Sequence, residues 1–174
     1  MRQERLITPP DFLTAVRIPL AVAFVVLANP LHRLIVLAAT VVSDVGDGIW
    51  ARRTGGSRVG AILDPICDKL FMLAAFWVLF RESSLHLVEL FAVLLRDAVA
   101  LLSFLAVWIL GRPTALPARA GGKAVTIGQV LVLLAFIADS DLIRPLVWAT
   151  GAVSLYAIAD YSRVVLTSSE REPE

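Results

Sequence analysis

The stretch DVGDGIWARRTGGSRVGAILDPICD, residues 44–68, contains four aspartates in two pairs, and long apolar segments flank it on both sides. A carboxylate at membrane depth costs roughly 2.5–3.5 kcal/mol on insertion scales, so ionisable groups placed there usually mark a functional site. Four carboxylates close together also need a compensating positive charge. We therefore expect this stretch to bind divalent metal ions.

The two aspartate pairs have helical spacing. Asp44 and Asp47 are three residues apart, Asp64 and Asp68 are four apart, and each pair therefore shares one helix face. Between the pairs, the polar and glycine-rich segment RRTGGSR predicts a turn. In an antiparallel helix pair, residues at equal depth have numbers with a constant total: 44 and 68 give 112, and 47 and 64 give 111. The carboxylates are therefore expected to form two facing rungs near one membrane surface.

Hard oxygen ligands in such a cluster suit Mg²⁺ or Mn²⁺. Two cations roughly 3.5–4 Å apart are the usual arrangement for displacement at phosphorus. The small residues Gly48, Ala51 and Gly60 allow a helix or a ligand to approach the backbone closely. Arg52 and Arg58 would lie at the rim, where guanidinium groups can hold a diphosphate. The alternative is an aspartate-bearing loop whose spacing is fortuitous.

The fixed positions of the stretch read Asp-x2-Asp-Gly-x2-Ala-Arg-x7-Gly-x3-Asp-x3-Asp, from Asp44 to Asp68. This pattern resembles the signature of the CDP-alcohol phosphotransferase (CDP-alcohol phosphatidyltransferase) family. Every fixed position is present, and the gap after Arg52 is seven residues, where eight is common in the family. The resemblance implies transfer of a phosphatidyl group from CDP-diacylglycerol to an alcohol, with release of CMP.

The resemblance also implies roles for individual residues. Asp44 and Asp64 would bridge two cations, with Asp47 completing one metal site and Asp68 the other. Asp68 would also take the proton of the acceptor hydroxyl. CDP-diacylglycerol would contact residues of the first three helices, namely Asp11, Thr14, Arg17, Gly48, Ala51, Arg52, Ser57, Arg58 and Gly60.

The segment PDFLTAVRI, which begins the first expected helix, resembles the Pro-Asn/Asp-x-x-Thr segment of family members. Thr14 and Arg17 are three residues apart, so they point the same way. Two alternatives remain for them: the Thr14 hydroxyl bonds its own helix, and Arg17 extends to the lipid headgroups.

The composition is that of an integral membrane protein. The chain has 174 residues, of which 58% are hydrophobic, and a mean hydropathy of +0.79, which is too apolar for a soluble domain of this size. A formal net charge of +1 indicates no strong attraction to nucleic acid. The N-terminal MRQERLI lacks the pattern of a signal peptide, and Cys67 alone excludes an internal disulfide.

We predict an all-α fold of six transmembrane helices, because each apolar segment is near the roughly 20 residues that span a bilayer. The expected bounds are 11–28, 31–52, 58–80, 84–110, 122–138 and 142–166. Residues 1–10 would form an interfacial juxtamembrane segment, 11–166 the catalytic domain and 167–174 a tail.

The basic residues predict the orientation of these helices. Ten lie on one side, and three, Arg33, Arg81 and Arg144, lie on the other. The positive-inside rule then places both termini, and a cavity holding the aspartates, on the cytoplasmic side of the cell membrane.

Two further groups of residues are candidates for function. Arg96 and Asp97 are adjacent in a helix, so each is expected to have a partner elsewhere, as an ion pair or as a substrate contact. The loop GRPTALPARAGGK places Arg119 and Lys123 at the cytoplasmic rim, where they can hold a phosphorylated acceptor.

The acceptor is most consistent with glycerol 3-phosphate, because GGKAVTIGQ resembles a Gly-Lys-x-Lys-Thr-x-x-Gln segment of phosphatidylglycerophosphate synthases; Val125 replaces the second lysine. Inositol 1-phosphate is the alternative, because RRTGGSRVGAILDPICDK resembles the same stretch of phosphatidylinositol-phosphate synthases. The family resemblance also implies a homodimer.

Two other classes of protein remain as alternative interpretations of the sequence. An intramembrane Mg²⁺-dependent prenyltransferase would need more helices and two separated aspartate motifs. A cation transporter would need acids spread through the bilayer midplane. A non-catalytic lipid binder belongs with the latter class, and stabilisation by CDP would favour the enzyme over either.

Overall fold

The computed structural model describes residues 9–54, 58–83, 85–109 and 120–169; the side chains described are those of residues 14–46, 49, 66–83, 85–103 and 121–160. The secondary structure of these ranges is helical, which confirms the all-α prediction. The helices are α1 (Pro9–Val26), α2 (Pro30–Thr54), α3 (Arg58–Glu82), α4 (Leu87–Ile109), α5 (Ala120–Ile137) and α6 (Ile143–Ser169). Each bound lies within three residues of the one expected from the sequence. Over the described residues, no helix has both the length and the apolar character needed to cross a membrane.

Local chemistry sets the starts of α2 and α4. The side-chain oxygen of Asn29 accepts a hydrogen bond from the Leu31 amide at 2.9 Å, and Pro30 fills the first helical position. At α4, the Glu89 carboxylate accepts a hydrogen bond from the His86 amide at 2.7 Å, as a capping-box glutamate does. These two caps explain why the chain restarts a helix after such short connections.

The end of α5 is a left-handed cap. Asp139 has a φ of 50°, and its amide donates to the Phe136 carbonyl at 3.1 Å. The Ser140 amide donates to the Ala135 carbonyl at 2.9 Å. This pair of bonds is the Schellman arrangement, which ends a helix and turns the chain sharply into α6.

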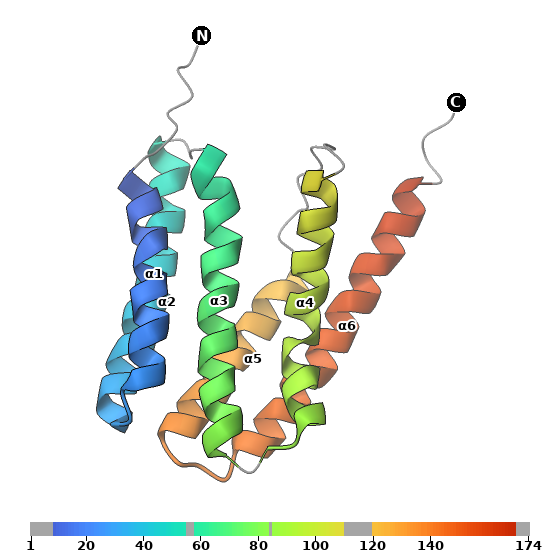
Figure 1. Cartoon of the computed structure of the whole chain (residues 1–174). Helices are drawn as coiled ribbons and strands as arrows, with labels where there is room; N and C mark the ends of the chain where they lie inside the picture. The colour runs from blue at the N-terminus through green and yellow to red at the C-terminus, as the bar shows by residue number, and fades with distance from the viewer. Residues whose placement is uncertain (1–8, 55–57, 84, 110–119, 170–174) are drawn as a thin grey trace. The chain divides into compact units, whose positions relative to one another are not determined.

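The helices divide into two compact units, residues 1–82 and 83–174. In the first unit, α1 packs along both α2 and α3 (Figure 1). Phe24 of α1 meets Phe71 of α3 edge to face, with ring centroids 5.8 Å apart, and both rings are fully buried. α1 therefore lies along both of the helices that carry the aspartates.

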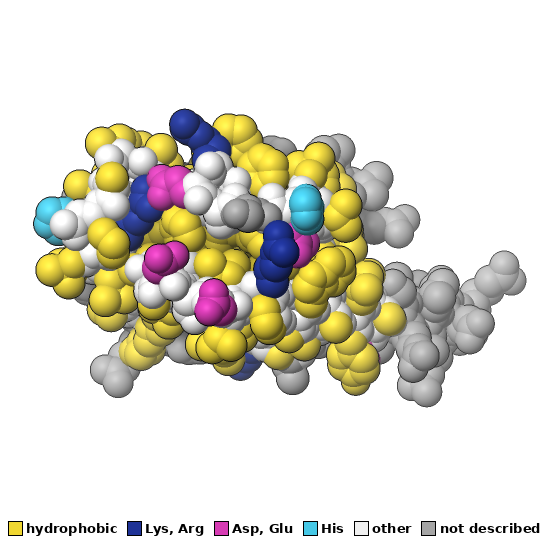
Figure 2. Space-filling model, turned by 90° about the horizontal axis from the view of Figure 1, so that it is seen from below, with side chains coloured by type: hydrophobic (Ala, Val, Ile, Leu, Met, Phe, Trp, Pro, Cys, Tyr) yellow, Lys and Arg dark blue, Asp and Glu magenta, His cyan; other side chains and the backbone are white. Residues whose placement is uncertain are grey.

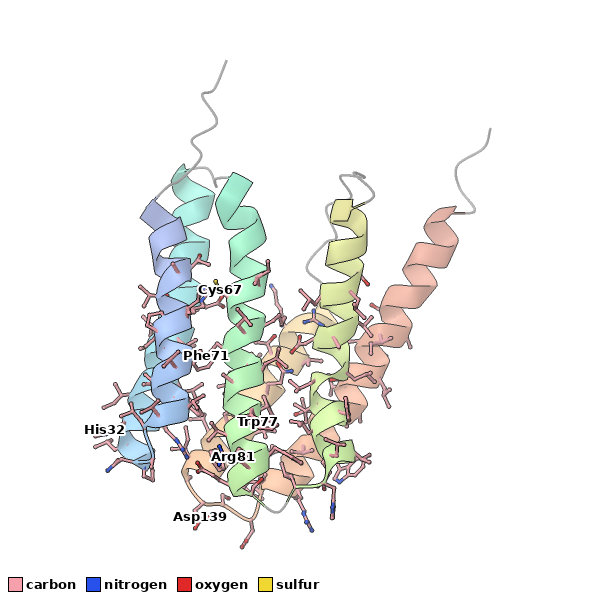
Figure 3. The ribbon with its side chains drawn as sticks, viewed as in Figure 1. His32, Cys67, Phe71, Trp77, Arg81 and Asp139 are labelled. Carbon is pink, nitrogen blue, oxygen red and sulfur yellow. The ribbon has the colours of Figure 1, made fainter. Side chains whose placement is uncertain are left out.

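α2 and α3 run antiparallel. Their connection joins Thr54 to Arg58 at one end, and at the other end Arg33 makes two hydrogen bonds to the Glu82 carboxylate, at 2.5 and 2.7 Å. Arg33 is buried and also donates to the Leu27 carbonyl at 2.6 Å. The numbers 33 and 82 total 115, close to the totals for the aspartate rungs. Figure 3 shows Arg81 and His32 at this same end of the unit.

The Arg33 and Glu82 pair makes stability depend on pH. The hydrogen bonds from Arg33 lower the pKa of Glu82 below its ordinary 4.5, although burial acts in the opposite direction. The pair therefore contributes stability above the unfolded pKa, and this contribution is lost as the pH falls through the folded pKa. The melting temperature of Glu82→Gln should lie below that of the unaltered protein at about pH 6, and the gap should close towards about pH 3. A gap that stays constant over this range would contradict the assignment.

In the second unit, α6 packs along α4 and α5 (Figure 1). Small residues bring these helices close together. A Cβ atom on Gly121 would lie 3.1 Å from Ala157, and one on Gly151 would lie 3.1 Å from Ala92. At Gly128 a Cβ atom would lie 2.5 Å from the Thr150 hydroxyl, and Thr150 is itself buried.

The two glycines Gly128 and Gly46 predict opposite effects of the same substitution. Gly128→Ala should lower the free energy of unfolding by about 1–3 kcal/mol, because the buried Thr150 has to shift. Gly46→Ala should raise it by up to about 1 kcal/mol, because nothing lies within 4 Å and alanine favours a helix interior. Thermal unfolding of both variants measures the difference. Equal effects of the two substitutions would contradict the packing of α5 on α6.

Large hydrophobic side chains are exposed on several helices. Examples are Val26, Val42, Phe91, Leu102 and Tyr156, whose exposed fractions range from 63% to 74%. Figure 2 shows hydrophobic side chains over much of the molecular face that it presents.

Candidate active site

The four aspartates of the signature lie on two consecutive helices of the first unit. Asp44 and Asp47 are in α2, and Asp64 and Asp68 are in α3. Because both members of each pair lie in one helix, the prediction from their spacing is that each pair shares one helix face. The side chains of Asp44 and Asp68 are described, and those of the other two lie outside the described side chains.

Asp44 forms an ion pair with a buried arginine. The Nη2 atom of Arg17 lies 3.0 Å from the Oδ1 atom of Asp44; the Arg17 side chain is fully buried, and that of Asp44 is 53% exposed. Removing a guanidinium from water is costly unless a charged partner accompanies it. Because arginine keeps its proton in proteins, α1 brings a permanent positive charge to the first aspartate of the signature.

The position of Arg17 follows from the buried face of α1. Thr14, Arg17, Ala21 and Phe24 are all buried and recur at helical intervals of three and four. This face packs on α2 and α3, so the guanidinium is held inside the unit beside Asp44. The sequence analysis placed Thr14 and Arg17 on a common face, which is confirmed.

Asp68 also has a positively charged neighbour. The Nζ atom of Lys69 lies 3.2 Å from the Oδ2 atom of Asp68, and their side chains are 15% and 32% exposed. Cys67, on the preceding position, is buried; it lies one turn before Phe71 on the side of α3 that faces α1 (Figure 3). Sequence reasoning missed Lys69 as part of the site, because adjacent helical residues point apart. A long lysine side chain can still curl back to its neighbour.

The chemistry of the described donors fits a hard divalent cation. Asp44 and Asp68 offer carboxylate oxygens that are partly exposed, and such oxygens are the ligands that Mg²⁺ and Mn²⁺ prefer. Among the side chains described, no three potential metal ligands gather at one point, and Asp47 and Asp64 are outside that set.

The second unit contains the pair Arg96 and Asp97. The expectation that each finds its partner elsewhere was wrong in one respect, because Arg96 Nη1 contacts Asp97 Oδ1 at 3.1 Å. Asp97 also accepts a hydrogen bond from Gln129 Nε2 at 2.6 Å, and the same nitrogen donates to the Val93 carbonyl at 3.0 Å. Asp97 and Gln129 are buried. This network joins α4 to α5.

The start of α5 holds Lys123, the remaining candidate whose side chain is described. Lys123 is exposed, as a residue at a rim would be. The Thr126 hydroxyl donates to the Gly122 carbonyl of its own helix at 3.2 Å. A Cβ atom on Gly122 would clash with Arg96 Nη2, so a larger residue here would force the end of the Arg96 side chain to move.

The other candidate residues are placed only in part. Asp11 lies in α1, Gly48, Ala51 and Arg52 lie in α2, and Arg58 and Gly60 lie in α3, with side chains outside those described. Ser57 and Arg119 lie outside the described residues altogether.

Comparison with known proteins identifies the family. Residues 7–159 match the family model of the CDP-alcohol phosphatidyltransferases, which covers most of the chain. The chain belongs to the CDP-alcohol phosphatidyltransferase family. No solved structure matches it.

The chain is similar to proteins of two descriptions. It is 33% identical, over 133 residues, to a protein of Mycobacterium tuberculosis provisionally named cardiolipin synthase; the match covers 74% of this chain and 63% of that relative. It is 28% identical to the CDP-diacylglycerol–glycerol-3-phosphate 3-phosphatidyltransferase of Aquifex aeolicus, covering 86% of this chain and 88% of the relative. The Escherichia coli K12 protein of the same name is 29% identical, covering 86% and 85%.

Proposed function

We propose that this protein transfers the phosphatidyl group of CDP-diacylglycerol to glycerol 3-phosphate and releases CMP, using two Mg²⁺ or Mn²⁺ ions. The observation that carries the proposal is the complete aspartate signature on consecutive helices α2 and α3. Its first and last members, Asp44 and Asp68, are partly exposed, and each has a basic side chain beside it. The family match over residues 7–159 supports the same chemistry.

The chain's own residues have defined tasks in this reaction. The acceptor hydroxyl oxygen attacks the phosphorus of the phosphatidyl group, the bond from that phosphorus to the CMP oxygen breaks, and CMP leaves with that oxygen. Asp68 takes the hydroxyl proton, a step in which a positioned carboxylate acts as general base. Divalent cations, when bound by the aspartates, neutralise charge on the diphosphate and on the leaving CMP.

Substrate binding is assigned to the basic and small residues around the signature. Arg52, Ser57 and Arg58, near the connection of α2 to α3, would hold the diphosphate of CDP-diacylglycerol. Gly48, Ala51 and Gly60 would let the nucleotide approach the backbone. Asp11 and Thr14 would close over it.

The proposed setting is the cell membrane, with the helices spanning the bilayer and both termini on the cytoplasmic side. The apolar composition and the exposed hydrophobic side chains support it. The distribution of basic residues, ten against three, supports the orientation. A homodimer is proposed from family resemblance alone.

The acceptor is proposed from two supports. Two relatives are named as glycerol-3-phosphate 3-phosphatidyltransferases and align with most of this chain. Arg119 and the exposed Lys123 would bind the acceptor phosphate. The relative named for cardiolipin synthesis favours a second candidate acceptor, phosphatidylglycerol, whose phosphatidylation gives cardiolipin.

An acceptor panel tests this proposal. Purified protein receives CDP-diacylglycerol, Mg²⁺ and one radiolabelled acceptor: glycerol 3-phosphate, inositol 1-phosphate, phosphatidylglycerol or unphosphorylated inositol. Label should enter lipid from glycerol 3-phosphate, with one CMP released for each lipid formed. Transfer from inositol 1-phosphate or phosphatidylglycerol alone would reassign the acceptor, and no CMP release with any acceptor would reject the enzyme.

A further inference from the structure

The ion pair between Arg17 and Asp44 is asymmetric. The guanidinium is fully buried in the first unit, whereas the carboxylate is 53% exposed, and the contact uses Oδ1 of Asp44. Arg17 is fixed by the packing of α1, because Thr14 before it and Ala21 after it are buried on the same face. The Asp44 carboxylate on α2 therefore contacts the Arg17 guanidinium, whose position is fixed by the packing of α1.

A carboxylate can serve two positive groups at once. Ionised aspartate has about four lone-pair sites on its two oxygens, so one carboxylate can contact an arginine and a cation together. Both positive groups would then share Asp44 and repel each other. By thermodynamic reciprocity, a cation weakens the ion pair as much as the ion pair weakens cation binding.

We propose that Arg17 is a built-in counter-ion of the metal site. It neutralises the charge of Asp44 in the metal-free protein and lowers the affinity of Asp44 for a cation. The inference rests on the proposed metal-dependent function and adds a task to Arg17 that the reaction scheme does not include. Arg17 holds the unit together before metal binds, and it keeps the cations exchangeable. It acts through Asp44, so it is a positioning residue.

The first unit contains a matched control at its other end. Arg33 is also buried and also pairs with an exposed carboxylate, that of Glu82, which is 47% exposed. This pair likewise joins two helices, but it lies outside the signature. Arg33→Met should therefore share any general cost of losing a buried arginine, with no effect on metal affinity.

The test measures Mn²⁺ affinity by calorimetry and melting temperature in EDTA for four proteins: unaltered, Arg17→Met, Arg17→Lys and Arg33→Met. Arg17→Met should melt lower in EDTA and bind Mn²⁺ about three- to tenfold more tightly, since the repulsion is gone. Arg17→Lys keeps the charge and should keep the original affinity. Arg33→Met should melt lower with unchanged affinity. Arg17→Gln is a second neutral variant if the methionine variant does not fold.

The outcomes separate this inference from the proposed function. Unchanged or weaker Mn²⁺ binding by the neutral Arg17 variants would overturn the counter-ion role and leave the metal site standing. Absence of Mn²⁺ binding to the unaltered protein would overturn the metal site itself and the inference with it.

Discussion

Replacing Asp68 with asparagine is expected to lower CMP release from CDP-diacylglycerol by about 10³-fold. Asparagine keeps the shape of the side chain, but it cannot take a proton from the acceptor hydroxyl and it carries no charge for a metal ion. The fold should persist, because the partly exposed contact with Lys69 is worth no more than about 1 kcal/mol. The measurement is the turnover of purified protein with Mg²⁺ and glycerol 3-phosphate, together with its melting temperature.

The matched control is Asp141→Asn. Asp141 is an exposed carboxyl group in the turn between α5 and α6, so its loss should leave turnover within about twofold, as expected for a surface substitution away from the site. Full turnover by Asp68→Asn, or an equal loss of turnover in both variants, would contradict the proposed role of Asp68 in the reaction.

Asp44→Asn is expected to reduce both activity and stability. The substitution removes a proposed metal ligand, and it also removes the carboxylate charge beside the fully buried Arg17. Breaking a buried ion pair by removing one partner costs about 3–5 kcal/mol; because Asp44 is half-exposed, we expect about 1–3 kcal/mol here. Turnover should fall at least about a hundredfold, within the range set by losing one electrostatic contact at the reacting centre. Activity and thermal unfolding are measured on the same preparation.

A double variant separates the two effects of Asp44→Asn. Adding Arg17→Met removes the buried charge that the first substitution leaves without its carboxylate, so stability should recover while activity stays low. Recovery of activity in the double variant would mean that Asp44 serves only the fold. A single variant as stable as the unaltered protein would contradict the ion pair.

The fold was predictable where local chemistry decides it. Asn29 and Pro30 form a cap and a first helical residue whatever the rest of the chain does. α2 ends at Thr54, just before the glycine-rich segment that predicts a turn. The faces of the helices were predictable for the same reason. Asp44 with Asp47, and Thr14 with Arg17, share a face because the helical period alone fixes it.

The partners of those faces were not predictable, because they depend on which helices pack together. Nothing in the spacing indicates that α1 lies along both α2 and α3, and so the contact of Arg17 with Asp44 was unforeseen. The prediction that adjacent helical residues do not contact each other was wrong at two positions, because the side chains there are long. Lys69 reaches Asp68, and Arg96 reaches Asp97, although adjacent positions on a helix point apart.

The packing roles of glycines between helices were also not predictable from the sequence. The sequence marks Gly122 and Gly128 as small, but their neighbours, Arg96 and Thr150, come from other helices of the second unit. The role of Gln129 was likewise hidden, because its partner Asp97 lies 32 residues earlier in the chain.

Electron paramagnetic resonance of Mn²⁺ bound to the purified protein tests the central claim most directly, because it counts the ions bound by the carboxylates that we propose as metal ligands on α2 and α3. The expected result is two Mn²⁺ per chain with a coupled spectrum, since ions roughly 3.5–4 Å apart interact magnetically, and loss of both in the Asp44→Asn, Asp68→Asn double variant. Unaltered protein that binds no Mn²⁺ at millimolar concentration, or a double variant that still binds two ions, would contradict it.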